Sequence, residues 1–104
     1  MTPKPIKFEI LGQEIDIIYR DSLSNERDAN GEAHFRDNQI WIQRDVKGCP
    51  RKEEQIEETF WHEVTHIILE KLQYQKLSEN EEFVGRFGSA LQQVVKTLQR
   101  DLID

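Results

Sequence analysis

Residues 51–73 read RKEEQIEETFWHEVTHIILEKLQ and carry the clearest structural pattern of this chain. Apolar side chains recur there at helical spacing, which is typical of a helix buried along one face. Glu53 and Glu54 suit the positive end of a helix dipole, and Pro50 suits a first helical turn. We therefore predict one helix over about residues 51–73. Its apolar face would comprise Ile56, Phe60, Val64, Ile67, Ile68 and Leu72.

The residues before this helix have the alternating pattern of half-buried strands, within about residues 5–43. Residues 6–10 and 15–19 predict a hairpin that turns at Gly12, because glycine tolerates a positive φ. Residues 33–35 and 39–43 predict a second hairpin. Its turn signal is Asp37-Asn38, and the polar residues 21–32 between the hairpins predict a loop.

A second helix is expected after the first, over about residues 79–102. Its apolar stripe would pack against the first helix and would comprise Val84, Phe87, Leu91, Val94 or Val95, and Leu98. Two hairpins followed by two helices predict an α+β fold. A length of 104 residues is typical of a single domain, which we assign to residues 1–104.

Composition excludes several classes of protein. Asp and Glu number 20 against 14 Lys and Arg, so a net charge of −6 argues against nucleic-acid binding. No apolar run approaches the length of a membrane span, and we expect neither a membrane partner nor a secretory signal. One cysteine, Cys49, forms no internal disulfide and fits a reducing, cytoplasmic location.

The pattern His62-Glu63-Val64-Thr65-His66 lies inside the predicted helix over residues 51–73. Histidines four residues apart project from one helix face, so their neutral imidazoles can converge on one zinc ion. Glu63 beside them can take a proton from zinc-bound water, whose pKa the metal lowers to about 7. The alternatives are a chance match and a helix with two solvated histidines.

A catalytic zinc needs a third protein ligand and one open position. Leu69 and Leu72 occupy the positions where the extended metzincin pattern requires Gly and His, which excludes that branch. A carboxylate from the last helix is the alternative. Glu81 shares a helix face with apolar residues, whereas Glu82 lies on a polar face and Glu79 lies at or before the helix start. We expect Glu81 to be the third ligand; the alternative is a capping box with Ser78.

These residues resemble the gluzincin branch of zinc metallopeptidases, through His62-Glu63-x-x-His66 and a downstream Asn80-Glu81-x-x-x-Gly85-x-Phe87-Gly88. The length is similar to small stand-alone zincin-like proteins, many encoded by phages and prophages. The resemblance spans about residues 40–98 and implies one Zn²⁺ held by His62, His66 and Glu81. It implies that Glu63 is the general base and that peptide bonds are hydrolysed.

Gly85 departs from that pattern, because many gluzincins carry there an Asp that orients a zinc-binding His. Glu58 and Glu70, one turn before and after the two histidines, could replace it, although a solvated helix face is the simpler interpretation. Candidates for the donor to a developing oxyanion are His34 and Tyr74, both more typical of structural roles.

Two further segments allow functional interpretations. The strand Gln39–Gln43 would be either an exposed edge that binds an extended peptide, as the resemblance implies, or an ordinary core strand. Cys49 would be either a buried small residue or a thiolate that blocks the fourth zinc position.

Three hypotheses follow. The first is a zinc-dependent metallopeptidase acting on a peptide or flexible protein segment; the second is a non-catalytic or latent zinc-binding interaction module; the third is a structural domain without metal. The pattern does not define the substrate or the oligomeric state.

Overall fold

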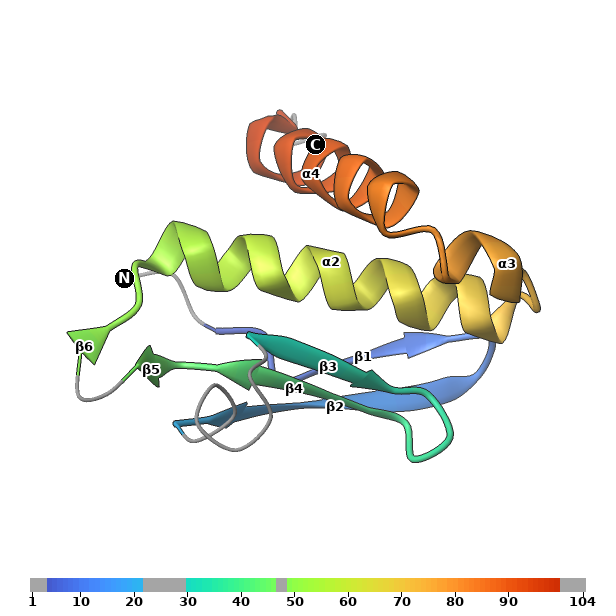
Figure 1. Ribbon diagram of the computed structural model, residues 1–104, viewed down its shortest axis with the longest axis horizontal. Coiled ribbons are helices and arrows are strands. Elements are labelled where there is room, and N and C mark those ends of the chain that lie inside the picture. Colours follow the sequence, from blue (N-terminus) through green and yellow to red (C-terminus); the bar gives the residue numbers. More distant parts are fainter. Residues whose placement is uncertain (1–3, 22–29, 47–48, 100–104) are drawn as a thin grey trace, which may run out of the picture.

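The computed structural model describes residues 4–21, 30–46 and 49–99. Within these residues the fold is α+β, as expected, with a four-stranded sheet, a two-stranded ribbon and three helices (Figure 1). Helix α2 lies across one face of the sheet, and helix α4 lies on the other side of α2. No helix in the described part of the chain is long and apolar enough to cross a membrane.

Both predicted hairpins are present. Strands β1 (Lys7–Ile10) and β2 (Gln13–Arg20) pair antiparallel through a turn in which Leu11 and Gly12 have φ of 51° and 76°. Strands β3 (Gly31–His34) and β4 (Gln39–Gln43) also pair antiparallel. Strand β3 therefore includes residues 31 and 32, which were expected to end the loop. Residues 22–29 of that loop lie outside the described residues.

The strand order β1-β2-β4-β3 places β4 in the interior of the sheet, where it pairs in parallel with β2. Ile40 and Ile42 of β4 are fully buried. The interpretation of residues 39–43 as an exposed edge is therefore wrong, and they form a core strand. Among the described strands, β3 forms this edge of the sheet, and it runs directly beneath α2 in Figure 1.

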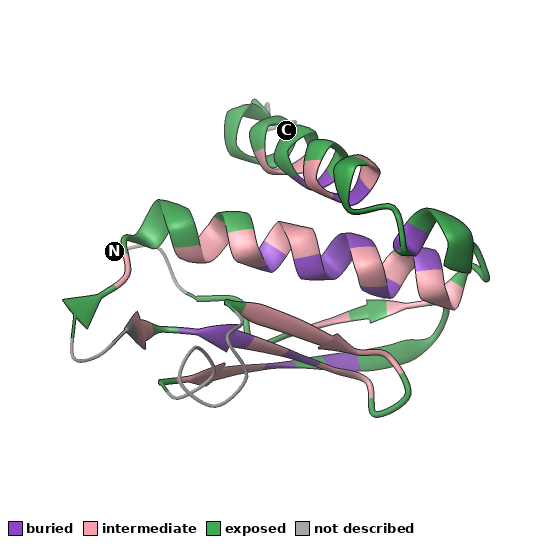
Figure 2. Ribbon diagram, viewed as in Figure 1, coloured by how far each residue is buried: buried purple, intermediate pink, exposed green. Residues whose placement is uncertain are grey.

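Helix α2 (Glu53–Lys71) confirms the predicted helix to within two residues at each end. Its buried face packs on the sheet and forms one core, and Figure 2 shows the buried stretches in purple along α2 and along the strands it faces. Burial of these apolar side chains stabilises the fold by roughly 1.5–3 kcal/mol for each. The core contains Ile15, Ile17, Ile40, Ile42, Phe60, Val64 and Ile67.

The start of helix α2 differs from the prediction. Pro50 belongs to strand β6 (Cys49–Pro50), which pairs with β5 (Asp45–Val46), and the helix begins only at Glu53. Because this ribbon projects beyond the end of the sheet, Cys49 is exposed (Figure 1). The expectation of a buried cysteine is therefore wrong.

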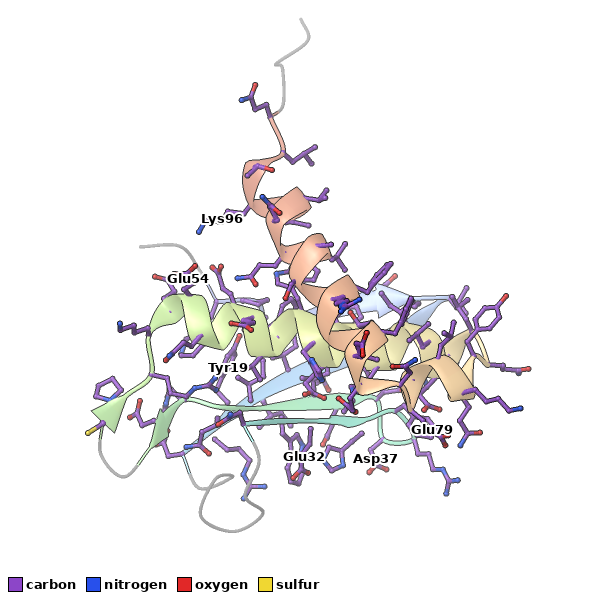
Figure 3. The ribbon with its side chains drawn as sticks, turned by 45° about the horizontal axis from the view of Figure 1, so that its top comes forward. Tyr19, Glu32, Asp37, Glu54, Glu79 and Lys96 are labelled. Atoms are coloured by element: carbon purple, nitrogen blue, oxygen red, sulfur yellow. The ribbon has the colours of Figure 1, made fainter. Side chains whose placement is uncertain are left out.

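The end of the chain contains a short helix α3 (Gln75–Ser78) and then α4 (Glu81–Thr97). Val84 and Gly88 are buried, but the later part of the expected apolar stripe is not. Figure 3 shows the reason: α4 crosses α2 and rises away from it toward Lys96, so that its last turns have no described residues beneath them. The exposed residues of these last turns are Val94, Val95 and Leu98. Phe87, earlier in the helix, is also exposed and stacks on Phe83. Residues 100–102 of the predicted helix lie outside the described residues.

Candidate metal centre

The two motif histidines lie on the side of α2 that faces the start of α4. His62 and His66 are one helical turn apart, and their ring centroids are 5.1 Å apart. Burial lowers the pKa of His66, although the Glu81 carboxylate opposes this shift. The imidazole of His66 is therefore neutral at neutral pH, and neutral imidazole is the form that ligates a metal.

Glu81, the first residue of α4, places its carboxylate between the two imidazoles. Its Oε2 lies 3.1 Å from Nε2 of His62, and its Oε1 lies 3.4 Å from Nε2 of His66. One ligand atom from each of the three residues lies within 4.8 Å of the others. Bonds of about 2.0–2.1 Å to a tetrahedral zinc place ligand atoms roughly 3.3 Å apart. The two distances from Glu81 to the histidines are close to this spacing, so the three residues are near enough to hold a metal ion.

The other roles considered for Glu81 and the other candidate carboxylates are not supported by the structure. Asn80 caps α4, since its side chain accepts a hydrogen bond of 3.0 Å from the Phe83 amide, so a capping box between Ser78 and Glu81 is not formed. Glu82 pairs with Arg86 on the exposed face of α4. Glu79 is exposed at the end of α3 and is not part of this group.

Ser78 is the site residue that sequence reasoning assigned to another role. Its hydroxyl is buried and lies 2.9 Å from Nδ1 of His66. If Nε2 faces a metal, Nδ1–H donates to Ser78 Oγ, which fixes the ring orientation. The structure shows no such hydrogen bond from Glu58 or Glu70 to the two histidines. Only the short helix α3 brings Ser78 to this position, and spacing along the chain does not reveal it.

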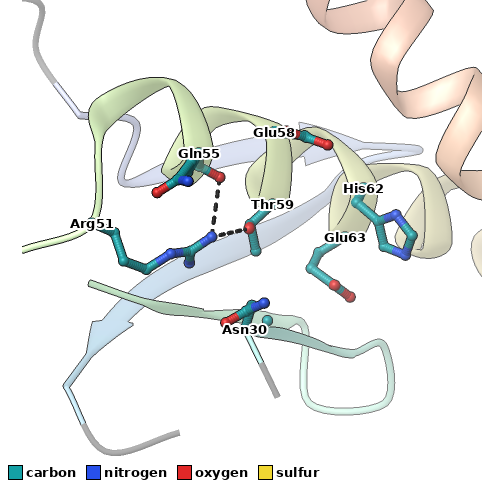
Figure 4. Close-up of a pocket in the computed structure, with 8 residues that line it drawn as sticks. Asn30, Arg51, Gln55, Glu58, Thr59, His62 and Glu63 are labelled. Atoms are coloured by element: carbon teal, nitrogen blue, oxygen red, sulfur yellow. Dashed lines mark hydrogen bonds between the residues drawn. The ribbon is translucent and has the colours of Figure 1, made fainter. Parts of the chain in front are cut away.

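Glu63 lies on a different side of α2, between the helix and strand β3 (Figure 4). Its side chain is buried, with 7% of the residue exposed. Burial raises the pKa of its carboxyl to about 8, and the negative charges of Glu81 and Glu32 add to this shift. Strand β3 approaches so closely that a Cβ on Gly31 would lie 3.0 Å from Cγ of Glu63. A buried carboxyl is thus held between α2 and β3, next in sequence to His62.

This buried carboxyl predicts a pH-dependent stability difference in chelator-treated protein. The folded chain keeps the Glu63 proton up to about pH 8, whereas the unfolded chain releases it near pH 4.5. The free energy of unfolding therefore falls as the pH rises between these values. We expect Glu63→Gln to match the wild type near pH 4.5 and to exceed it by a few kcal/mol at pH 8. Urea unfolding at both pH values measures this, and an equal difference at both would contradict it.

Gly88 sets the distance between α4 and the motif. A Cβ at this position would lie 3.2 Å from the backbone N and Cα of His62, so α4 would have to move away. Gly85, one turn earlier, has no atom within 4 Å of such a Cβ. Gly88 therefore permits the close approach that brings Glu81 to the histidines.

We expect Gly88→Ala to weaken zinc binding by about tenfold or more, on the scale of changes that misplace a ligand. The matched control is Gly85→Ala, which should leave zinc affinity unchanged and stabilise the helix by about 0.5–1 kcal/mol. Competition with a chromogenic chelator measures the affinities. Equal zinc affinities for the two variants would show that the close approach at Gly88 is not required.

Two clefts run along the groove between α2 and β3 and meet at Glu63. The Arg51 cleft, of about 630 Å³, also contains Gly31, Thr59 and His62. The His66 cleft, of about 350 Å³, lies toward the end of α2 and contains His66, Glu70 and Ser78. An extended chain in this groove would pass the metal group at its centre.

The other predicted site residues do not belong to the group formed by His62, His66 and Glu81. His34 borders the His66 cleft, but Gly31 and Ala33 pair with core residues of β4, so the alternation of the strand turns the His34 side chain toward the opposite face of the sheet. There Nε2 of His34 lies 2.9 Å from Glu32. Tyr74 is exposed and Cys49 lies beyond the N-terminal end of α2. Cys49 and Tyr74 therefore do not belong to the group formed by the two histidines and Glu81.

Comparisons of the chain with protein-family models, with curated proteins and with solved structures found no match.

Proposed function

We propose that the chain is a zinc-dependent metallopeptidase in which His62, His66 and Glu81 hold one zinc ion and Glu63 is the general base. The observation that carries this proposal is the meeting of three ligand atoms from two helices within 4.8 Å, beside a buried carboxyl. The resemblance to gluzincins includes the same four residues and supports a zincin-like form of the fold.

Zinc in a site with one open position lowers the pKa of a coordinated water to about 7 and polarises a carbonyl group. The chain's own side chains would then transfer the proton that this water releases. Glu63 accepts it at a carboxylate oxygen and returns it to the leaving amine. The positive charge of a bound cation favours the carboxylate form of Glu63, which opposes the rise in pKa that burial causes.

The edge strand β3 supports an extended peptide as the substrate. In the described residues no strand pairs with the outer edge of β3, so its backbone groups are available to a further strand. This edge runs along both clefts, and Gly31 brings it against Glu63. A peptide added there would pass the base and the metal group in extended form.

The proposal is tested by incubating the zinc-loaded chain with a broad peptide library and detecting new termini by mass spectrometry. We expect cleavage that stops with a chelator and returns with zinc. Zinc binding without any cleavage would favour the second hypothesis, a zinc-binding interaction module. Absence of bound zinc at micromolar concentration would contradict both and leave a structural domain.

A further inference from the structure

The Arg51 cleft contains a fixed cation. The guanidinium of Arg51 donates from Nη1 to the Gln43 carbonyl (2.7 Å) and from Nη2 to the Gln55 carbonyl (3.2 Å) and Thr59 Oγ1 (2.8 Å). Figure 4 shows the last two contacts. All three acceptors are neutral, so they orient the guanidinium without neutralising its charge.

Arg51 forms no ion pair with a carboxylate in the part of the chain that the structure describes. By contrast, the exposed Arg44 forms two hydrogen bonds of 3.0 and 2.9 Å with the carboxylate of Asp21. Burial lowers the pKa of Arg51, and the nearby charge of Glu58 opposes that shift only in part. A half-buried cation without a counter-ion is unfavourable, and an anion that enters the cleft would relieve this.

Arg51 lies about one helical turn from the site of the proposed reaction. Its guanidinium contacts Thr59, which lies one helical turn before His62 and Glu63, about 5 Å along the axis. An extended peptide advances about 3.3 Å for each residue. A group bound by Arg51 would therefore lie one to three residues from the scissile bond.

The two ends of the groove differ in the cations they offer. The Arg51 cleft contains the Arg51 guanidinium beside the exposed Glu58 and the buried Glu63. The His66 cleft contains Glu70 and has no lysine or arginine among its described lining residues. A carboxylate would therefore find a fixed cation to pair with on one side of the scissile bond only.

We propose that Arg51 binds a carboxylate of the substrate, so that the groove selects peptides with a negative charge one to three residues to one side of the scissile bond. This inference rests on the proposed function, because it places the carboxylate relative to a bond that is cut. The carboxylate is either an acidic side chain or the free C-terminus of the peptide. The guanidinium suits both sources, because its charge attracts a carboxylate and its three internal hydrogen bonds leave one N–H of Nη1 and the N–H of Nε to donate.

The test is a binding measurement with the zinc-loaded Glu63→Gln variant, which should not cut its ligand. The probes are hexapeptides of alanine and glutamine with capped ends, in which a single glutamate moves from position to position. A second set lacks the glutamate and carries a free C-terminal carboxylate, which distinguishes the two sources. We expect the best glutamate or free-carboxylate peptide to bind about tenfold more tightly than the all-neutral peptide.

In the same Glu63→Gln chain, Arg51→Gln should remove this difference. Arg51→Lys should keep part of it, because lysine retains the charge but not the fixed orientation of the guanidinium. Arg44→Gln is the control and should keep the full difference. Thermal unfolding of each variant excludes loss of fold as the cause. Discrimination that persists in Arg51→Gln, or that is absent with Arg51 in place, would overturn the inference.

Cleavage by the wild-type chain distinguishes this inference from the proposed function. If Arg51 selects carboxylate peptides but the chain cleaves no library peptide, the carboxylate site is retained and the peptidase is rejected. Cleavage without a preference for acidic residues on one side would retain the peptidase and reject the role of Arg51.

Discussion

Glu63→Gln should lower the rate of peptide cleavage by about 10²–10⁴-fold while the chain keeps one bound zinc. Glutamine has nearly the same shape and fits the buried position between α2 and β3, but it accepts no proton. The loss should appear in kcat with little change in KM, because the carboxylate acts on the reacting atoms and does not anchor the peptide.

The matched control is Glu58→Gln. Glu58 borders the Arg51 cleft one turn before His62, but it is exposed and forms no hydrogen bond with either histidine in the described residues. We expect this variant to cleave at close to the wild-type rate. Wild-type cleavage by Glu63→Gln, with zinc content and unfolding temperature unchanged, would reject Glu63 as the general base.

His66→Ala should abolish tight zinc binding. His66 is the more buried of the two histidines and its ring is fixed by Ser78, so its loss removes both a ligand and the oriented part of the site. We expect wild-type chain to retain one equivalent of zinc through dialysis and His66→Ala to retain none, measured by elemental analysis. Glu81→Gln should also lose zinc, because an amide is a much weaker ligand than a carboxylate.

Zinc binding should also stabilise the fold, because the site joins α2 to α4. Zinc at 100 times its dissociation constant would add about 2.7 kcal/mol to the free energy of unfolding of the wild-type chain. His66→Ala should show no such gain. The control Glu82→Gln should behave as the wild type, since Glu82 pairs with Arg86 on the far face of α4. An unchanged zinc content in both His66→Ala and Glu81→Gln would reject this ligand set.

Local patterns along the chain predicted most of the elements. Alternation in residues 6–10 and 15–19 and the positive-φ turn at Gly12 correspond to the β1–β2 hairpin, and helical spacing corresponds to α2. Helix phase also separated Glu81 from Glu82, because one lies on the face that packs against α2 and the other on the solvated face. These features depend on neighbours in sequence.

Features that depend on distant residues were not predicted. The parallel pairing of β2 with β4 moves residues 39–43 from a possible edge to the sheet interior, and only long-range contacts determine it. The apolar stripe of α4 shows that the helix is amphipathic, but its spacing does not show that the helix diverges from α2. Likewise, the contact of Ser78 with His66 and the position of Arg51 in the groove arise only from tertiary packing.

We propose that one zinc ion held by His62, His66 and Glu81 drives peptide hydrolysis. The most direct test of this claim is the cleavage rate of the best library peptide, measured while chelator-treated chain is titrated with zinc. We predict a rate that rises linearly and reaches its maximum at one equivalent of zinc per chain. A chain that binds one equivalent of zinc yet shows no cleavage at any point of the titration would contradict the claim.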